Sequence, residues 1–303
     1  MINKEFYIKV QKKTVKRMVR LATDTSANLP RELLEKHNIA MLAFQYTVDG
    51  KEAEYKEDWD SDGKRFFDAM RAGAVVDTSL VNMGRFIECF EPMLQNGDDV
   101  IYIGMSSGVS GTYNASRLAA EELNEKYPGN KVITFDTYGA GLGEGLVVLK
   151  AAEMIAEGKS VDEINEYLLA RRQNLCQYFS VGDLKYLQRT GRVSMATAIV
   201  GNILSIKPIL IGDETGHIVA CAKERGLKRV LQHLADKFDE LVEDKSHYIS
   251  MSHADCPEIT EQLLKILRER GFTGVCISSM WEPVTGSHVG PGSIALFFWG
   301  IHK

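Results

Sequence analysis

The chain has 303 residues, of which 45% are hydrophobic and 25% charged, and its net charge is −5. This composition excludes an intrinsically disordered chain and a small disulfide-stabilised fold, and the acidic balance disfavours bulk binding of nucleic acid. No apolar run approaches the roughly 18 residues of a membrane span, and the length exceeds what one hydrophobic core usually serves. We therefore expect two domains and no membrane crossing.

The first 17 residues form a strongly basic extension. They hold six Lys or Arg residues and one Glu, a net charge of +5. No apolar stretch follows the basic residues, so the pattern is not that of a secretory signal peptide. Two alternatives stay open: Met18 is the native start, or the extension is a functional basic arm of a DNA-associated regulator.

Short apolar runs alternate with helical patterns along residues 18–174. The expected strands are 19–22, 39–48, 100–105 and 132–136, and the expected helices are 32–37, 63–72, 83–95, 113–126, 145–157 and 161–174. Alternation of this kind predicts a parallel sheet with helices on both faces. We expect a Rossmann-like α/β domain over residues 18–174.

Residues 175–303 have a different character. The expected strands are 177–181, 207–211, 217–222, 248–252, 274–279 and 294–299, with helices over 227–242 and 259–270 and a short amphipathic helix after Asp183. Hairpin-like strand pairs among helices predict a mixed sheet. We expect a second α/β domain over residues 175–303.

The cysteine pattern argues against disulfides and metal binding. The five cysteines are odd in number, widely spaced and without a C-x-x-C pair: Cys89, Cys176, Cys221, Cys256 and Cys276. Such thiols are typical of inert side chains in a reducing compartment, and no Cys/His pair has the spacing of zinc ligands. We expect a cytoplasmic protein with no metal and no cofactor.

The segment from Gly104 to Thr112 carries the strongest chemical signal. It follows an expected strand, opens an expected helix, and contains Ser106, Ser107 and Ser110. Backbone N–H groups at a helix N-terminus bind anions, and glycine lets a ligand approach the backbone closely. The segment predicts a phosphate or carboxylate site, with an ordinary capped Gly/Ser turn as the structural alternative.

The same segment contains a G-x-S-x-G pattern centred on Ser106. In α/β-hydrolases this pattern marks a nucleophile between a strand and a helix, and His253 and His288 follow later in the chain. However, residues 109–111 separate the pattern from the helix, and an HGGG-type segment is absent from the sequence. A serine hydrolase acting through Ser106 remains the alternative function.

Two further segments are rich in hydroxyl groups. Residues 23–26 follow the first expected strand, and the pair Thr78-Ser79 follows residues 74–76 and precedes a helix that Asn82 is expected to cap. Loops at the carboxyl ends of parallel strands converge at the crevice where such sheets bind ligands. We therefore expect all three hydroxyl-rich segments to face one small anionic ligand.

Basic and histidine-bearing segments occupy the second half. Arg192 follows the short amphipathic helix, residues 223–229 form a basic cluster at a helix start, and His288 lies in an expected Gly/Pro loop over 286–292. A solvated face is one interpretation of the basic residues, and a patch for phosphate or an acidic partner is the other. The glycines around His288 favour a ligand-facing ring.

In combination and in order along the chain, these segments resemble the DegV family over about residues 20–298. The matching pieces are Thr23-Asp24-Thr25-Ser26, Thr78-Ser79, residues 106–113, residues 183–192, Lys207-Pro208, Lys223-Glu224-Arg225 and residues 288–292. Two features depart from the family pattern. Residues 80–82 replace its usual Gln-Pro-Ser, which puts the hydrogen bonds of that loop in question, and the basic extension lies outside it.

The resemblance implies a protein that buries one long-chain fatty acid, such as palmitate, stearate or oleate, between two α/β domains. It implies that the chain does no chemistry itself and presents the carboxylate to a separate fatty acid kinase subunit, which forms the acyl phosphate. Transient contact with a membrane surface is compatible with such a carrier. By position, the carboxylate contacts are Thr78, Ser110 and His288, with Ser107 and Ser79 beside them. Arg192 and Arg225 match basic positions near the mouth, where the kinase or the phosphate would lie.

Overall fold

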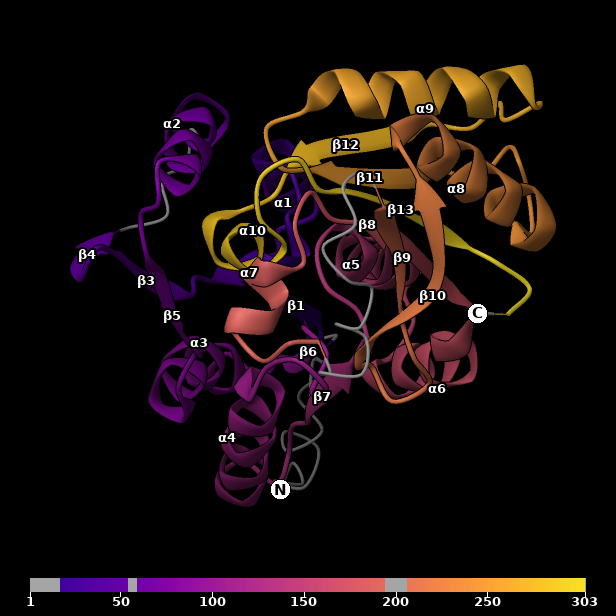
Figure 1. The fold of residues 1–303 in the computed structure, drawn as a ribbon. Helices are drawn as coiled ribbons and strands as arrows, with labels where there is room; N and C mark the ends of the chain where they lie inside the picture. The colour runs from indigo at the N-terminus through magenta and orange to yellow at the C-terminus, as the bar shows by residue number, and fades with distance from the viewer. Residues whose placement is uncertain (1–16, 54–58, 194–205, 303) are drawn as a thin grey trace, which may run out of the picture.

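The computed structural model describes residues 17–53, 59–193 and 206–302. Its strands form a four-stranded, a six-stranded and a three-stranded sheet, and Figure 1 shows their arrangement. The expected basic extension lies outside the described residues, apart from Arg17. The α/β fold class predicted from the sequence, with a parallel sheet followed by a mixed one, is confirmed.

The first sheet is wholly parallel. Its order is β2-β1-β6-β7, and its strands are β1 (Val19–Asp24), β2 (Ala40–Leu42), β6 (Asp99–Gly104) and β7 (Val132–Asp136). Helices α1 (Arg31–Lys36) and α4 (Thr112–Lys126) connect its strands, and α3 (Met83–Gln95) and α6 (Val161–Arg171) also pack on it. The carboxyl ends of β1 and β6 therefore lie side by side.

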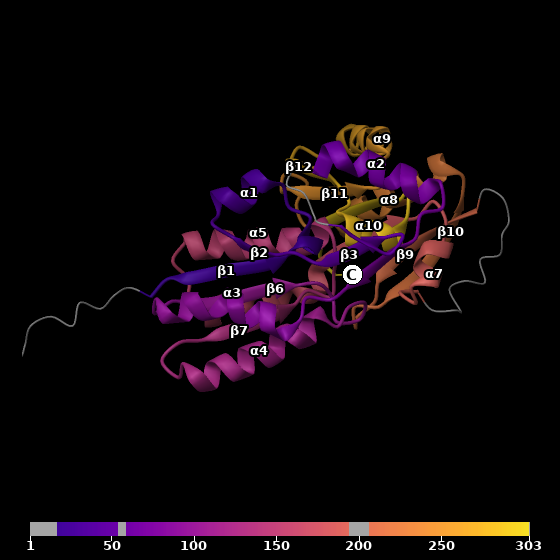
Figure 2. The same ribbon diagram turned by 90° about the vertical axis from the view of Figure 1, so that its left-hand side faces the viewer.

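The second sheet is mixed. Its order is β10-β9-β8-β13-β11-β12. Among the described strand pairs of this sheet, only β11–β12 is parallel. The strands are β8 (Leu175–Ser180), β9 (Ile206–Gly212), β10 (Ile218–Arg225), β11 (Ile249–His253), β12 (Cys276–Met280) and β13 (Ile294–Trp299). Helices α8 (Leu227–Leu241) and α9 (Pro257–Glu269) pack on it, and Figure 2 shows α4 and α9 at opposite ends of the molecule.

A small antiparallel sheet corrects the sequence interpretation at two places. Its order is β4-β3-β5, with β3 (Gln45–Val48), β4 (Lys51–Ala53) and β5 (Val76–Ser79), and α2 (Trp59–Arg71) connects β4 to β5. Residues 39–48 therefore contain two strands that belong to different sheets. Between these strands, the Phe44 N–H donates to Thr25 Oγ1 (3.2 Å). Thr78 and Ser79 lie on a strand and not in a loop, whereas Asn82 caps α3 as predicted.

Helix α5 (Leu142–Ala156) holds the two large sheets together. It contacts β1 and β6 of the first sheet and β11 and β13 of the second, and Figure 1 shows it near the centre of the molecule. Most of its residues are buried, so its sequence is apolar all round and not amphipathic.

Strand β13 separates two hydrophobic clusters. Ala295, Phe297 and Trp299 belong to the cluster that contains α5, whereas Leu296 and Phe298 belong to the cluster under α8 and α9. Alternate side chains of a strand point to opposite faces, so burial on both faces requires the unbroken apolar run seen here. Strand β8 begins one residue after the predicted domain boundary at 174, but the first cluster draws on both halves, so that boundary stays a prediction.

Candidate functional site

A cavity of about 240 Å³ lies between the first and second sheets. Its walls come from β5, the loop after β6, the loop after β7, strands β8 and β13, and the short helices α7 (Lys185–Arg189) and α10 (Pro283–Val289). Most of the wall is apolar, formed by Phe44, Leu80, Met105, Val109, Phe179, Leu187, Ile218, Trp281, Val284, Val289 and Phe297. Such a cavity suits a ligand that is largely hydrocarbon.

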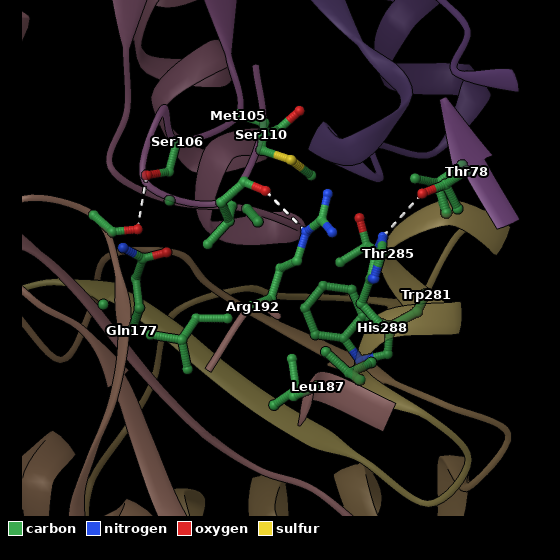
Figure 3. Close-up of a pocket in the computed structure, with 18 of the residues that line it drawn as sticks. Thr78, Met105, Ser106, Ser110, Gln177, Leu187, Arg192, Trp281, Thr285 and His288 are labelled. Carbon is green, nitrogen blue, oxygen red and sulfur yellow. Dashed lines mark hydrogen bonds between the residues drawn. The ribbon is translucent and has the colours of Figure 1, made fainter. Parts of the chain in front are cut away.

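Polar side chains from separate elements meet in this cavity. Five of the residues predicted as binding or partner-facing line it, namely Thr78, Ser79, Ser110, Arg192 and His288. The Thr78 hydroxyl and His288 Nε2 are 3.2 Å apart, although the residues are 210 positions apart in the chain (Figure 3). Tertiary folding thus gathers hydroxyl, imidazole and guanidinium groups at one part of an apolar cavity.

Helix α10 positions His288, and this corrects the prediction of a Gly/Pro loop. The Glu282 carboxylate accepts from the backbone N–H of Val284 and Thr285, and Pro283 occupies the first turn. Gly290 ends the helix at φ +75°, and a Cβ there would collide with the Tyr186 ring. An acidic cap, a proline and a closing glycine were the sequence signals for this helix.

Thr285 also lines the cavity and was missed by the sequence analysis. Its side chain is buried, and its hydroxyl has no hydrogen-bond partner among the described residues. Neither does the Nδ1 atom of His288, one turn later on the same helix. A threonine between valine and glycine gave no local signal of a ligand contact.

We expect the His288 ring to be uncharged at neutral pH. Burial lowers its pKa to about 4, and the nearby positive charges of Arg192 and Arg189 act in the same direction. Among the described residues that line the cavity, the one cation is the Arg192 guanidinium, whose Nε donates to the Val109 carbonyl (3.2 Å).

Of the three serines in the segment after β6, Ser106 and Ser110 line the cavity and Ser107 does not. The Ser110 hydroxyl lines the cavity and donates to Thr112 Oγ1 (3.0 Å), while the Thr112 N–H donates back to Ser110 Oγ (3.3 Å). Ser107 is exposed, and its backbone N–H donates to the Asp136 carboxylate (3.2 Å). Of the residues that the sequence analysis placed at the carboxylate, Ser107 is therefore not in the cavity wall.

Ser106 does not have the environment of a nucleophile. It is buried, and its hydroxyl donates to the Gly216 carbonyl (2.8 Å) while accepting from the Gly108 N–H (3.1 Å). A triad serine donates to a histidine instead. The G-x-S-x-G pattern is here a turn that joins the first half of the chain to the β9–β10 hairpin.

The hydroxyl-rich segment after β1 does not face the cavity. The expectation that all three hydroxyl-rich segments face one ligand is therefore wrong for this segment. Thr23, Asp24, Thr25 and Ser26 are all buried, and none of them lines the cavity. Ser26 Oγ contacts carboxylate oxygens of both Asp24 and Glu144. Burial raises the pKa of Asp24, and burial together with the Asp24 charge raises that of Glu144. These hydroxyls therefore serve an internal acidic network.

Arg225 lies away from the cavity. It is an exposed residue at the end of β10, an edge strand of the second sheet, and the basic cluster 223–229 spans this strand end and the start of α8. Charged residues are typical of edge strands, which they protect from pairing with other chains. Neither a metal-binding cluster nor a helix able to span a membrane occurs among the described residues.

Comparison with known proteins gives a consistent assignment. A family model described as "Uncharacterised protein, DegV family" matches residues 18–300. A DegV domain-containing protein of Clostridium perfringens is 38% identical over 284 residues, which cover 93% of this chain and 97% of that protein.

Solved structures agree in fold over nearly the whole chain. One is a DegV family protein of Thermus thermophilus whose structure is described as showing fatty acid binding. It is 25% identical to this chain with a TM-score of 0.83, and the match covers 94% of this chain and 100% of that one. DegV of Bacillus subtilis, described as a fatty acid binding protein, is 28% identical with a TM-score of 0.79, covering 95% and 100%. The sequence, the fold and these relatives agree, and the chain belongs to the DegV family.

Proposed function

We propose that this protein binds a long-chain fatty acid, with the carboxylate at Thr78, Ser110 and Arg192 and close to His288, and with the acyl chain along the apolar wall. The observation that carries the proposal is the cavity itself, which combines a cluster of hydrogen-bonding groups with an apolar wall between two sheets. Relatives at 25% and 28% identity are described as fatty acid binding proteins, which supports it.

The energetics favour such a ligand. Each buried CH₂ contributes about 0.8 kcal/mol, so a sixteen-carbon chain offers on the order of 10 kcal/mol before ordering costs. A buried carboxylate is costly unless it is hydrogen-bonded, and hydroxyl and guanidinium donors meet this requirement. Thr78, Ser110 and Arg192 are donors of these kinds in the cavity wall.

We further propose that the chain is a carrier and that a separate kinase subunit phosphorylates the bound carboxylate. The polar part of the cavity lies close to the surface, because the neighbouring Leu80 side chain is 48% exposed and Gly111 is also exposed. A carboxylate held there is within reach of a second protein. Arg192 then offers a positive charge to the carboxylate and afterwards to the phosphate, while Arg225 is an exposed candidate for partner contact.

Mass spectrometry of lipid co-purified with the protein tests the proposal. We expect one long-chain fatty acid per chain after denaturing extraction, and little lipid from the double variant Thr78→Ala/Ser110→Ala. Purified wild-type protein that neither carries nor takes up palmitate, stearate or oleate would overturn the proposal. Turnover of an ester that disappears in Ser106→Ala would instead establish the hydrolase alternative.

A further inference from the structure

We propose that Thr285 is a further carboxylate ligand, which donates its hydroxyl hydrogen to the fatty acid while His288 holds Thr78 in the donor orientation. This inference rests on the proposed function, since it concerns the head group of the same ligand. It adds a residue that neither the hydroxyl-rich segments nor the family resemblance indicated.

The first observation is an unsatisfied hydroxyl. Thr285 is 6% exposed, and its Oγ1 makes no hydrogen bond of normal geometry within the described part of the chain, although it lies close enough to the Glu282 carboxyl group to counteract part of the rise in its pKa. A threonine in a helix commonly bonds to a carbonyl one turn earlier, as Ser287 does with the Val284 carbonyl (2.7 Å). Buried hydroxyls nearly always have a hydrogen-bond partner. A hydroxyl without such a bond in a cavity wall therefore points to a ligand group that accepts its hydrogen.

The second observation is the position of Thr285. Residues three apart on a helix are neighbours on one face, so Thr285 shares its face of α10 with His288. Figure 3 shows Thr285 between Arg192 and His288, on the same side of the cavity as Thr78. Its hydroxyl therefore faces the region that the other head-group residues surround.

The third argument counts hydrogens. A neutral imidazole has one N–H donor and one acceptor nitrogen. If the Thr78 hydroxyl donates to the carboxylate, then its oxygen accepts the hydrogen of His288 Nε2, 3.2 Å away. His288 Nδ1 is then an acceptor and cannot bond to a carboxylate, so the donor that this helix supplies to the ligand is the Thr285 hydroxyl.

Thr285→Val tests the inference, because valine has nearly the same shape and lacks the hydroxyl. After removal of lipid, we expect the Kd for palmitate to rise about tenfold, as for the loss of one hydrogen bond to a charged group. Thr285→Ser keeps the hydroxyl and should stay within about threefold of the wild type. Ser287→Ala is the matched control, since its hydroxyl lies on the same helix, does not line the cavity, and should leave the Kd unchanged.

Two further measurements separate a ligand contact from a structural role. The effect of Thr285→Val should shrink to about threefold or less for hexadecanol, because a hydrogen bond to a neutral group is about half as strong. The urea midpoint of unfolding should not fall without lipid. An unchanged Kd for palmitate in Thr285→Val, or equal losses in the Val and Ser variants, would overturn the inference while leaving fatty acid binding intact. A wild type that binds no palmitate would overturn the proposed function and this inference together.

Discussion

Two hydroxyl-rich loops follow neighbouring parallel strands, yet they have opposite roles. Residues 23–26 follow β1 and residues 105–112 follow β6, and these strands pair directly. The first loop is buried and its hydroxyls meet carboxylates, whereas part of the second lines the cavity. The same residue types at the same edge of a sheet thus built an internal network in one case and a ligand wall in the other.

The difference comes from one distant residue. Glu144 lies in the first turn of α5, and its carboxylate accepts from Thr23 Oγ1 (3.1 Å) and contacts Ser26 Oγ. Asp24 contacts the same Ser26 hydroxyl at 2.6 Å. One hydroxyl hydrogen serves only one of the two carboxylates, so the other contact requires a proton on a carboxyl group. The raised pKa values of Asp24 and Glu144 agree with this count.

The largest effect on stability is expected from a substitution in the first loop, residues 23–26. Ser26→Ala leaves two buried carboxyl groups short of a partner, which should lower the free energy of unfolding by about 2–4 kcal/mol. Urea denaturation of lipid-free protein measures this. The control is Ser107→Ala, whose exposed hydroxyl should change stability by less than about 0.5 kcal/mol. Equal stabilities of the two variants would mean that the network contributes nothing.

A pH effect of similar size should come from Glu282, which belongs to the same group of buried acids. Burial raises its pKa from the ordinary 4.5 to about 7. Between these values the folded state keeps a proton that the unfolded state has lost, so stability falls as the pH rises from about 4.5 to 7. The loss is at most about 3 kcal/mol.

Glu282→Gln should remove this part of the pH dependence, because glutamine does not titrate, and its one carbonyl oxygen still accepts one of the two helix-capping hydrogen bonds. The measurement is the difference in unfolding free energy between variant and wild type from pH 5 to pH 8. His288, with its lowered pKa, acts in the opposite direction below pH 6.5, but it is common to both proteins and cancels. Parallel pH profiles would show that Glu282 is charged throughout.

A substitution in the second loop, residues 105–112, should change ligand affinity and not stability, in contrast to one in residues 23–26. Ser110→Ala removes a hydroxyl that donates to Thr112 Oγ1 without ligand and that we expect to turn to the carboxylate when it is bound, so the Kd for palmitate should rise about tenfold or more while the urea midpoint changes little. Titration of lipid-free protein with palmitate gives the Kd. A loss of stability comparable to that of Ser26→Ala, with unchanged affinity, would reverse the roles of the two loops.

The smallest effect expected on binding concerns the two arginines. Arg192→Ala should raise the Kd for palmitate several-fold and slow acyl phosphate formation by a kinase subunit even at saturating fatty acid, because its charge lies in the cavity wall. Arg225→Ala should leave the Kd unchanged, since Arg225 is exposed and remote from the cavity. Equal Kd values for the two variants would argue that Arg192 does not face the carboxylate.

The sequence by itself determined the local structure and the order of the sheets. Strands β7 and β13 and helix α3 have the predicted bounds, because short apolar runs and an Asn-capped amphipathic pattern are properties of contiguous residues. Strand–helix alternation implied the parallel sheet, and the hairpins implied the mixed one. The candidate residues Thr78, Ser110 and His288 also came from local segments together with the family resemblance.

Only the tertiary structure decided which polar groups face the cavity. The partners of Ser26 and Thr78 lie 118 and 210 positions away, at Glu144 and His288, and no local pattern encodes contacts at such separations. For the same reason, the orphaned hydroxyl of Thr285 is visible only once α10 has packed between β3 and α7. A hydroxyl's role depends on whether a protein group has already satisfied it, and that is settled when distant elements pack together.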